Sequence, residues 1–116
     1  EADLFDDTAQ AFAKLIAERS ARGDINKSTQ LRRFYDEVCL WDNKLRTAPD
    51  KFNDYLPLIR MINAKVAYAK GRRLVDEGFA DMIRECLQRV KTKGNFDNFK
   101  LFFEAFMGFY KMYNSK

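Results

Sequence analysis

Histidine is absent from this 116-residue sequence. Its absence removes the commonest general base, the commonest metal ligand and every Ser-His or Cys-His nucleophile pair. Without histidine, the two cysteines of the chain, Cys39 and Cys86, cannot build a structural zinc site. Both fall on predicted apolar helical stripes, so we interpret them as reduced core thiols of a cytoplasmic protein. We expect no catalytic residue, no metal ion and no cofactor, although a carboxylate-based nuclease remains an alternative.

Glycine and long apolar runs are also scarce. The five glycines occur singly, so no glycine-rich loop is present to cradle a phosphate, and no EF-hand or GxxxxGK[ST] motif appears. No run of about 18 apolar residues occurs, which predicts no membrane span. No signal-peptide pattern opens the sequence, which begins with Glu1 rather than Met. Alternation of apolar and polar residues never lasts, so we expect no strand.

What the sequence does contain is a helical pattern with a mild positive charge. Apolar residues make up 47% of the chain, which supports a real core, and the formal net charge is +4. The length fits one domain over residues 1–116. We predict an all-α fold, a single bundle of about five helices. The expected ranges are 1–22, 28–46, 57–73, 79–93 and 95–114.

Local signals place the ends of these helices. Gly23 is expected to end the first helix in the left-handed conformation, and Gly94 to stop the fourth. Pro57 fits the first turn of the third helix, where its missing N–H costs nothing. Asn95 or Asp97 is expected to cap the fifth.

The third predicted helix carries an unusual charge distribution. From Pro57 to Val75 there are five basic residues and no acidic one. Its expected apolar stripe consists of Leu58, Met61, Ile62, Val66 and Ala69. Lys65 falls near the middle of that stripe, on the same side as Met61, Tyr68 and Arg72. Two interpretations stay open: Lys65 lays its methylenes on the core with its ammonium in water, or a cation and an aromatic ring meet a phosphate backbone here.

Two arginines stand just inside the start of the second predicted helix. Arg32 and Arg33 lie at the positive end of the helix dipole, where cations are disfavoured. An external anion is one reason for such a pair. Ion pairs one turn away, with Asp36 and Glu37, are the other interpretation, in which the arginines belong to a solvated face.

The fifth predicted helix is apolar over most of its circumference. Only Lys100, Glu104, Gly108 and Lys111 form a polar strip. A helix that is apolar on nearly all sides is buried on more than one side. It is therefore either the central helix of the bundle or a surface covered by another subunit. Trp41 lies off the main stripe of its own helix and has the same two interpretations.

Three segments in register resemble a known family. The first is SxQLRxFY, formed by Ser28, Gln30, Leu31, Arg32, Phe34 and Tyr35. The second runs from Leu56 through Met61 and Tyr68 to Arg72, and the third is Phe102-Phe103-Glu104-Ala105-Phe106 before Tyr110. Over residues 28–111 the sequence is similar to the small subunit of the type III-A CRISPR effector, the Csm complex.

The resemblance implies a non-catalytic antiviral-defence subunit with a basic face toward the guide–target RNA. The partners it implies are the crRNA and target RNA backbone, other Csm subunits and further copies of this chain, including a possible homodimer. Carried onto this chain, the RNA-binding residues are Arg32, Arg33, Arg60, Lys65, Lys70, Arg72 and Arg73. The candidate subunit contacts are Trp41, Leu101, Phe109 and Met112. The alternative function is a helical homodimeric interaction module with no nucleic-acid role. A helix-turn-helix DNA binder would need a tighter connector than residues 46–56 provide.

Overall fold

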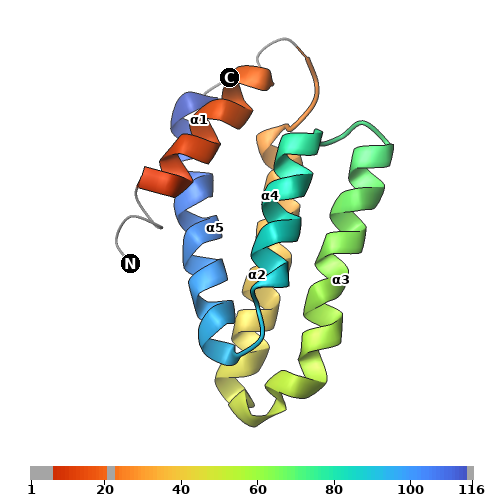
Figure 1. Ribbon diagram of the computed structural model, residues 1–116, viewed down its shortest axis with the longest axis vertical. Helices are drawn as coiled ribbons and strands as arrows, with labels where there is room; N and C mark the ends of the chain where they lie inside the picture. Colours follow the sequence, from red (N-terminus) through yellow and green to blue (C-terminus); the bar gives the residue numbers. More distant parts are fainter. Residues whose placement is uncertain (1–6, 21–22, 115–116) are drawn as a thin grey trace.

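The chain folds into an all-α bundle, as the sequence predicts. The computed structural model describes residues 7–20 and 23–114, and in this part of the chain it contains five α-helices, a short 3-10 turn and no strand (Figure 1). The elements are α1 Ala9–Arg19, α2 Ser28–Thr47, η2 Pro49–Lys51, α3 Phe52–Gly71, α4 Glu77–Gln88 and α5 Lys93–Tyr113. Asp3, Phe5 and Asp6, which the sequence places in the first helix, lie outside the described residues.

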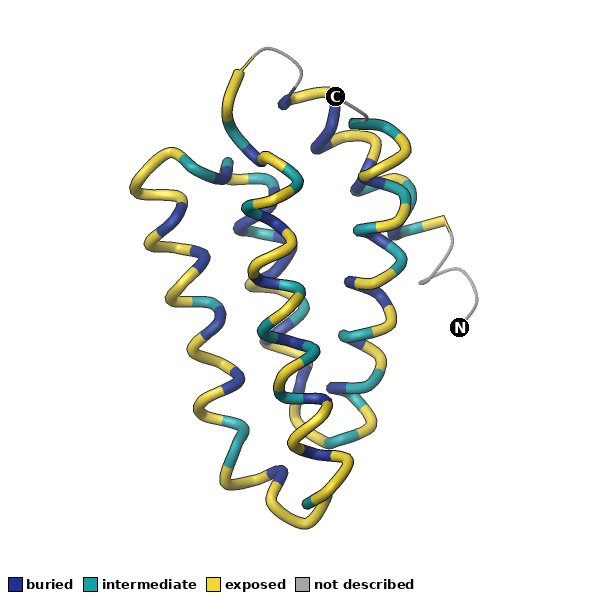
Figure 2. The backbone as a smooth tube through the Cα atoms, turned by 180° about the vertical axis from the view of Figure 1, so that it is seen from behind, coloured by how far each residue is buried: buried dark blue, intermediate teal, exposed yellow. Residues whose placement is uncertain are grey.

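The four longer helices run alternately up and down. Helix α2 packs between α3 and α5, α3 packs on α4 as well, and α1 packs on α5 (Figure 1). The bundle is flat, with extents of 44 × 32 × 20 Å. Figure 2 shows that α3 is exposed along much of its length. Its main contacts are with α2 and α4, and most of its residues are exposed.

The core is aromatic and is supplied mainly by α5. Its buried members on that helix are Phe96, Phe99, Phe102, Phe103, Phe106 and Tyr110. Phe79 of α4 is fully buried, with its ring centroid 6.2 Å from that of Phe103 and 6.0 Å from those of Phe34 and Phe106. Aromatic rings at such separations contribute beyond the area they bury. The aromatic run of α5 is thus used largely inside this chain.

Several helix ends differ from those predicted. Helix α3 begins at Phe52, so Pro57 lies in the helix and not in its first turn. Gly94 is the second residue of α5 and does not stop α4. The cap of α5 is Thr92, whose hydroxyl accepts from the Asn95 N–H at 3.1 Å while Asn95 Oδ1 accepts from the Thr92 N–H at 3.2 Å. This reciprocal pair satisfies two amides that the helix leaves unpaired.

The link from α1 to α2 is held by Asn26 and not by Gly23. Helix α1 ends at Arg19, and no described glycine has a positive φ. Asn26 is fully buried with φ of 57°, in the left-handed region that asparagine tolerates. Its Nδ2 donates to Ser20 Oγ at 3.0 Å, and its Oδ1 accepts from the Asp76 N–H at 2.9 Å. Its carbonyl accepts from the Tyr110 hydroxyl at 2.6 Å, so one residue joins α1, the α3–α4 turn and α5.

Candidate nucleic-acid interface

An open surface runs along the seam between α2 and α3. Lys65 bridges the two helices, with its Nζ 3.0 and 2.9 Å from the two carboxylate oxygens of Glu37. Side chains on either side of this pair point outward from both helices. We call this surface the α2–α3 face; its residues are Arg33, Leu40, Lys44, Leu58, Met61, Lys65, Tyr68 and Arg72.

The α2–α3 face combines cations with exposed apolar side chains. Leu40 and Leu58 are each 50% exposed, Met61 is 51% and Tyr68 is 69% exposed. The predicted apolar stripe of α3 is therefore confirmed at Ile62, Val66 and Ala69 and wrong at Leu58 and Met61. Ile59 is buried where Leu58 was expected, and Met61 faces solvent. Leu40 and Lys44 were not identified from the sequence, because their place beside α3 depends on the α2–α3 register.

Lys65 lies on this surface together with Met61, Tyr68 and Arg72, as the sequence predicts. Its ammonium is neither buried nor simply solvated, because it is paired with Glu37. The Lys65 side chain is 54% exposed and the Glu37 side chain 19%. A pair this open contributes little to stability, about 0–1 kcal/mol. Glu37 nevertheless neutralises the central cation of the face.

The end of α3 is strongly basic and conformationally unusual. The Arg72 guanidinium lies 5.9 Å from the centre of the Tyr68 ring. Arg73 adopts φ of 63°, in the position after a helix where glycine is usual. Lys70, Arg72 and Arg73 form no ion pair with any residue in the described ranges. These three predicted residues gather at the C-terminal end of α3, and Arg72 is the one that belongs to the α2–α3 face.

Arg32 and Arg33 face different neighbours, because consecutive helical residues lie about 100° apart. Arg33 belongs to the α2–α3 face. Arg32 instead lines a cleft of about 530 Å³ between α2 and α5, together with Tyr35 and Lys111. Its Nε lies 3.9 Å from the carboxylate of Asp36, with both side chains well exposed. Burial, together with Cys39, raises the pKa of Tyr35, so its phenol is protonated at neutral pH.

Arg60 lies apart from the other predicted RNA-binding residues. Its Nη2 donates to the carbonyl of Val90 at 2.9 Å, across the α3–α4 contact. It also lines a small hollow with Asn63 and Arg84, away from α2. Val90 follows the end of α4, where carbonyls have no partner within the helix. Arg60 therefore links α3 to the segment that follows α4.

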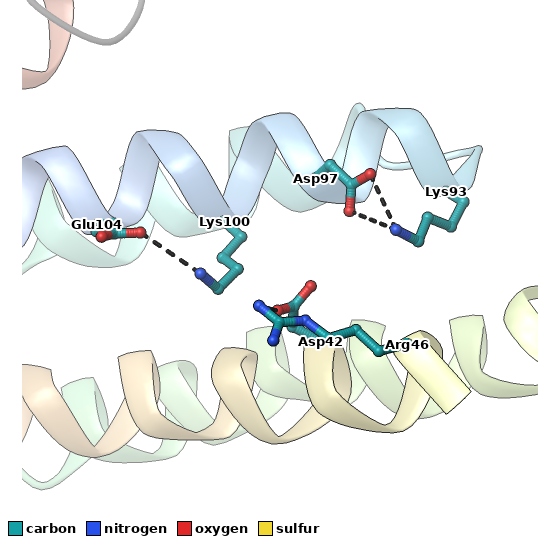
Figure 3. Close-up of polar contacts among 6 residues, drawn as sticks. All are labelled: Asp42, Arg46, Lys93, Asp97, Lys100 and Glu104. Carbon is teal, nitrogen blue, oxygen red and sulfur yellow. Dashed lines mark hydrogen bonds and ion pairs between the residues drawn. The ribbon is translucent and has the colours of Figure 1, made fainter. Parts of the chain in front are cut away.

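Between α2 and α5 the charges neutralise one another. Figure 3 shows Lys93 with Asp97 and Lys100 with Glu104 along α5, at 2.9 and 3.4 Å, and Arg46 beside Asp42 of α2. The Arg46 guanidinium lies 3.1 Å from the Asp42 carboxylate, which is only 10% exposed. Each of these pairs joins residues four apart on one helix. This side of α2 therefore has no excess of positive charge among the residues drawn.

The four predicted subunit contacts have different surroundings. Trp41 is partly buried against Tyr55, with ring centroids 5.3 Å apart, and its Nε1 is buried with no hydrogen-bond partner among the described residues. Phe109 is partly buried on the core. Leu101 and Met112 are 48% and 57% exposed, and they project from the same side of α5, three turns apart.

No described group is arranged for nucleophilic or metal chemistry. Within the described ranges no cluster of three or more Cys, Asp and Glu side chains is placed to hold a metal ion. Burial raises the pKa of the Cys86 thiol to about 12, which removes its nucleophilic form at neutral pH. No helix in the described part of the chain is both long and apolar enough to cross a bilayer. The chemistry that the α2–α3 face offers is noncovalent contact.

A comparison with protein families assigns this helical chain to one of them. The family described as Csm2 Type III-A matches residues 1–116. The chain belongs to the Csm2 family, the small subunits of the type III-A CRISPR complex. This is a family of non-catalytic subunits that associate with other Csm proteins. No curated protein and no solved structure matches the chain.

Proposed function

We propose that this chain is a non-catalytic subunit that contacts the guide–target RNA backbone through the α2–α3 face and packs on neighbouring Csm subunits. The observation that carries the proposal is the unbalanced charge of residues 55–75, which comprise most of α3 and the turn after it. From Tyr55 to Val75 there are five basic residues and no acidic one. Three of them gather at the end of α3 without an ion pair in the described ranges.

The mode of contact is phosphate recognition, which is nearly blind to sequence. Lysine and arginine on an open helical surface reach phosphates and displace counterions, so binding weakens as salt rises. Arg33, Lys65 and Arg72 are the central cations, and Lys70 and Arg73 extend them past the helix end. Arg32 is a further cation, which lies on the other side of α2 in the cleft between α2 and α5. Arg60 is proposed to hold α3 to α4 rather than to bind RNA.

The test is RNA binding by the pure chain across a salt series. We compare the wild type with Arg33→Ala/Lys65→Ala/Arg72→Ala. A control removes three exposed cations elsewhere, by Lys14→Ala/Arg89→Ala/Lys91→Ala. The face variant is expected to lower the slope of log affinity against log salt by about 2 for a single strand. The control is expected to keep the wild-type slope. Equal effects of the two triple variants would show that net charge, and not the α2–α3 face, governs binding.

A second function rests on the exposed apolar side chains. In this function a second copy of the chain packs against Leu40, Leu58 and Met61, and the protein is a homodimeric interaction module. That function predicts a concentration-dependent dimer in light scattering, its loss in Met61→Glu, and no RNA binding in low salt. An enzyme would instead cleave RNA when divalent metal is added to the pure chain, and we expect no cleavage.

A further inference from the structure

Tyr68 is not packed on the core, and the contact that the structure gives its ring is with the Arg72 guanidinium. It is the most exposed of the large apolar side chains in the described ranges, at 69%. Its ring packs on no other aromatic ring there, and its hydroxyl makes no hydrogen bond with a described residue. By contrast, the hydroxyl of Tyr110 bonds Asn26, and the ring of Tyr55 packs on Trp41. The flat apolar surface of Tyr68 is open to a ligand.

Cations flank this ring along the helix. Lys65 lies three residues before Tyr68, and Arg72 four residues after it with its guanidinium 5.9 Å from the ring centre. Lys65 and Arg72 are about 10 Å apart along the helix axis. An exposed aromatic ring between cations is the arrangement by which proteins hold single-stranded nucleic acid, with a base on the ring and phosphates on the cations.

We infer that Tyr68 is a stacking platform for an unpaired nucleobase of RNA, with Lys65 and Arg72 holding the phosphates on either side. This inference rests on the proposed function and specifies its ligand. In a continuous duplex both faces of each base are covered by neighbouring bases, so a ring on an open helix surface cannot reach them. The ligand is therefore a single strand or a base displaced from a duplex. Because every base offers a flat aromatic face, stacking adds affinity without a sequence preference.

The charge around Tyr68 favours RNA over a protein partner. Lysine is depleted at the centres of protein–protein interfaces, although tyrosine and arginine are enriched there. Along α3, Lys65 and Arg72 instead lie about one turn to either side of the ring, and Glu37 is the acid paired with Lys65. Cations and an open ring together match a nucleotide chain better than an apolar protein surface.

The experiment measures three RNA probes in low salt. They are a single strand of about 12 nucleotides carrying 2-aminopurine, its abasic counterpart with the same phosphates, and a blunt duplex of equal length. The variants are Tyr68→Phe, which keeps a ring, and Tyr68→Leu, which keeps apolar bulk without one. The side chain is mostly exposed, so equal thermal melting of both variants and the wild type is expected.

The wild type and Tyr68→Phe are expected to bind the base-bearing strand about tenfold more tightly than the abasic strand, and to quench 2-aminopurine. Tyr68→Leu is expected to lose about tenfold on the base-bearing strand and nothing on the abasic strand or the duplex. If Tyr68→Leu binds the base-bearing strand like the wild type, or if it changes only the mass in light scattering, the inference is overturned. If the wild type binds none of the probes, the proposed function itself fails.

Discussion

Helices α3 and α5 are nearly equal in length, at 20 and 21 residues, yet they serve the molecule differently. Helix α5 buries six aromatic residues and pairs Lys93 and Lys100 with acids on its own surface. Helix α3 buries Phe52, Ile59, Ile62, Val66 and Ala69 and exposes three large apolar side chains among its cations. The comparison shows that α5 supplies more of the interior, although it exposes Leu101 and Met112, whereas α3 exposes apolar side chains beside cations.

The largest expected effect tests whether α5 stabilises the fold more than α3 does. Phe103→Ala is expected to lower the free energy of unfolding by about 3–5 kcal/mol, because it leaves a cavity between the rings of Tyr35, Phe79, Phe99 and Phe106. The measurement is urea denaturation followed by circular dichroism.

Met61→Ala on α3 is the matched control for this substitution. Its side chain is half exposed, so a change within about 0.5 kcal/mol is expected. Similar losses from the two substitutions would mean that α3 is as much a part of the core as α5.

The next effect concerns Asn26, which is bonded to Tyr110 of α5 and to Asp76 in the turn after α3. Asn26→Gly keeps the left-handed backbone but leaves the partly buried Asp76 N–H without its acceptor and removes one of the donors to the Ser20 hydroxyl, so we expect a loss of about 2–3 kcal/mol. Asn26→Ala adds backbone strain at φ of 57° and is expected to cost about 1 kcal/mol more. Thermal and urea unfolding measure both. Equal stability of the alanine and glycine variants would show that the backbone conformation at this position carries no strain.

The smallest expected effect tests whether the cations of α3 contact RNA. Glu37→Gln releases Lys65 from its carboxylate, so RNA affinity in low salt is expected to rise about two- to fivefold, in line with the small energy of an open ion pair. The salt slope is expected to steepen by about 0.7 for a single strand. Fluorescence anisotropy with a labelled strand provides the measurement.

The control for this effect is Glu104→Gln, which removes the same charge from the acid that pairs with Lys100 on α5. A smaller change is expected there, because Lys100 lies outside the α2–α3 face and its side chain is only 19% exposed. If the two variants raise RNA affinity equally, the gain reflects the change in net charge, and the position of Glu37 beside Lys65 has no effect of its own.

The sequence predicts the helices well, because helical periodicity is a local property. The five helices, the aromatic burial of α5 and the grouping of Lys65 with Met61, Tyr68 and Arg72 on one side are all confirmed. The sequence predicts the ends of the helices less well. Thr92 and Asn95 cap α5 through a reciprocal pair of hydrogen bonds, and Gly94 therefore lies inside the helix.

The candidate site could be predicted only in part, because its geometry depends on contacts between distant segments. The bond from Arg60 to Val90 spans 30 residues, and the pair of Lys65 with Glu37 spans 28. Neither follows from spacing along one helix. The sequence could not decide whether Leu58 or Ile59 faces the core, because both fit an apolar stripe and only the packing of α3 on α2 and α4 selects one of them.

The pairing of α1 with α5 has a consequence for synthesis of the chain. Helix α1 packs on α5, and Asn26 accepts its bond from Tyr110, 84 residues later. When α1 leaves the ribosome, the helix that covers Ala13 and Ile16 has not yet been made. Contacts between segments so far apart form late, so the apolar side of α1 stays open to chaperones and to other nascent chains during translation. Helix α5, which is translated after α1 to α4, is thus the one that covers α1.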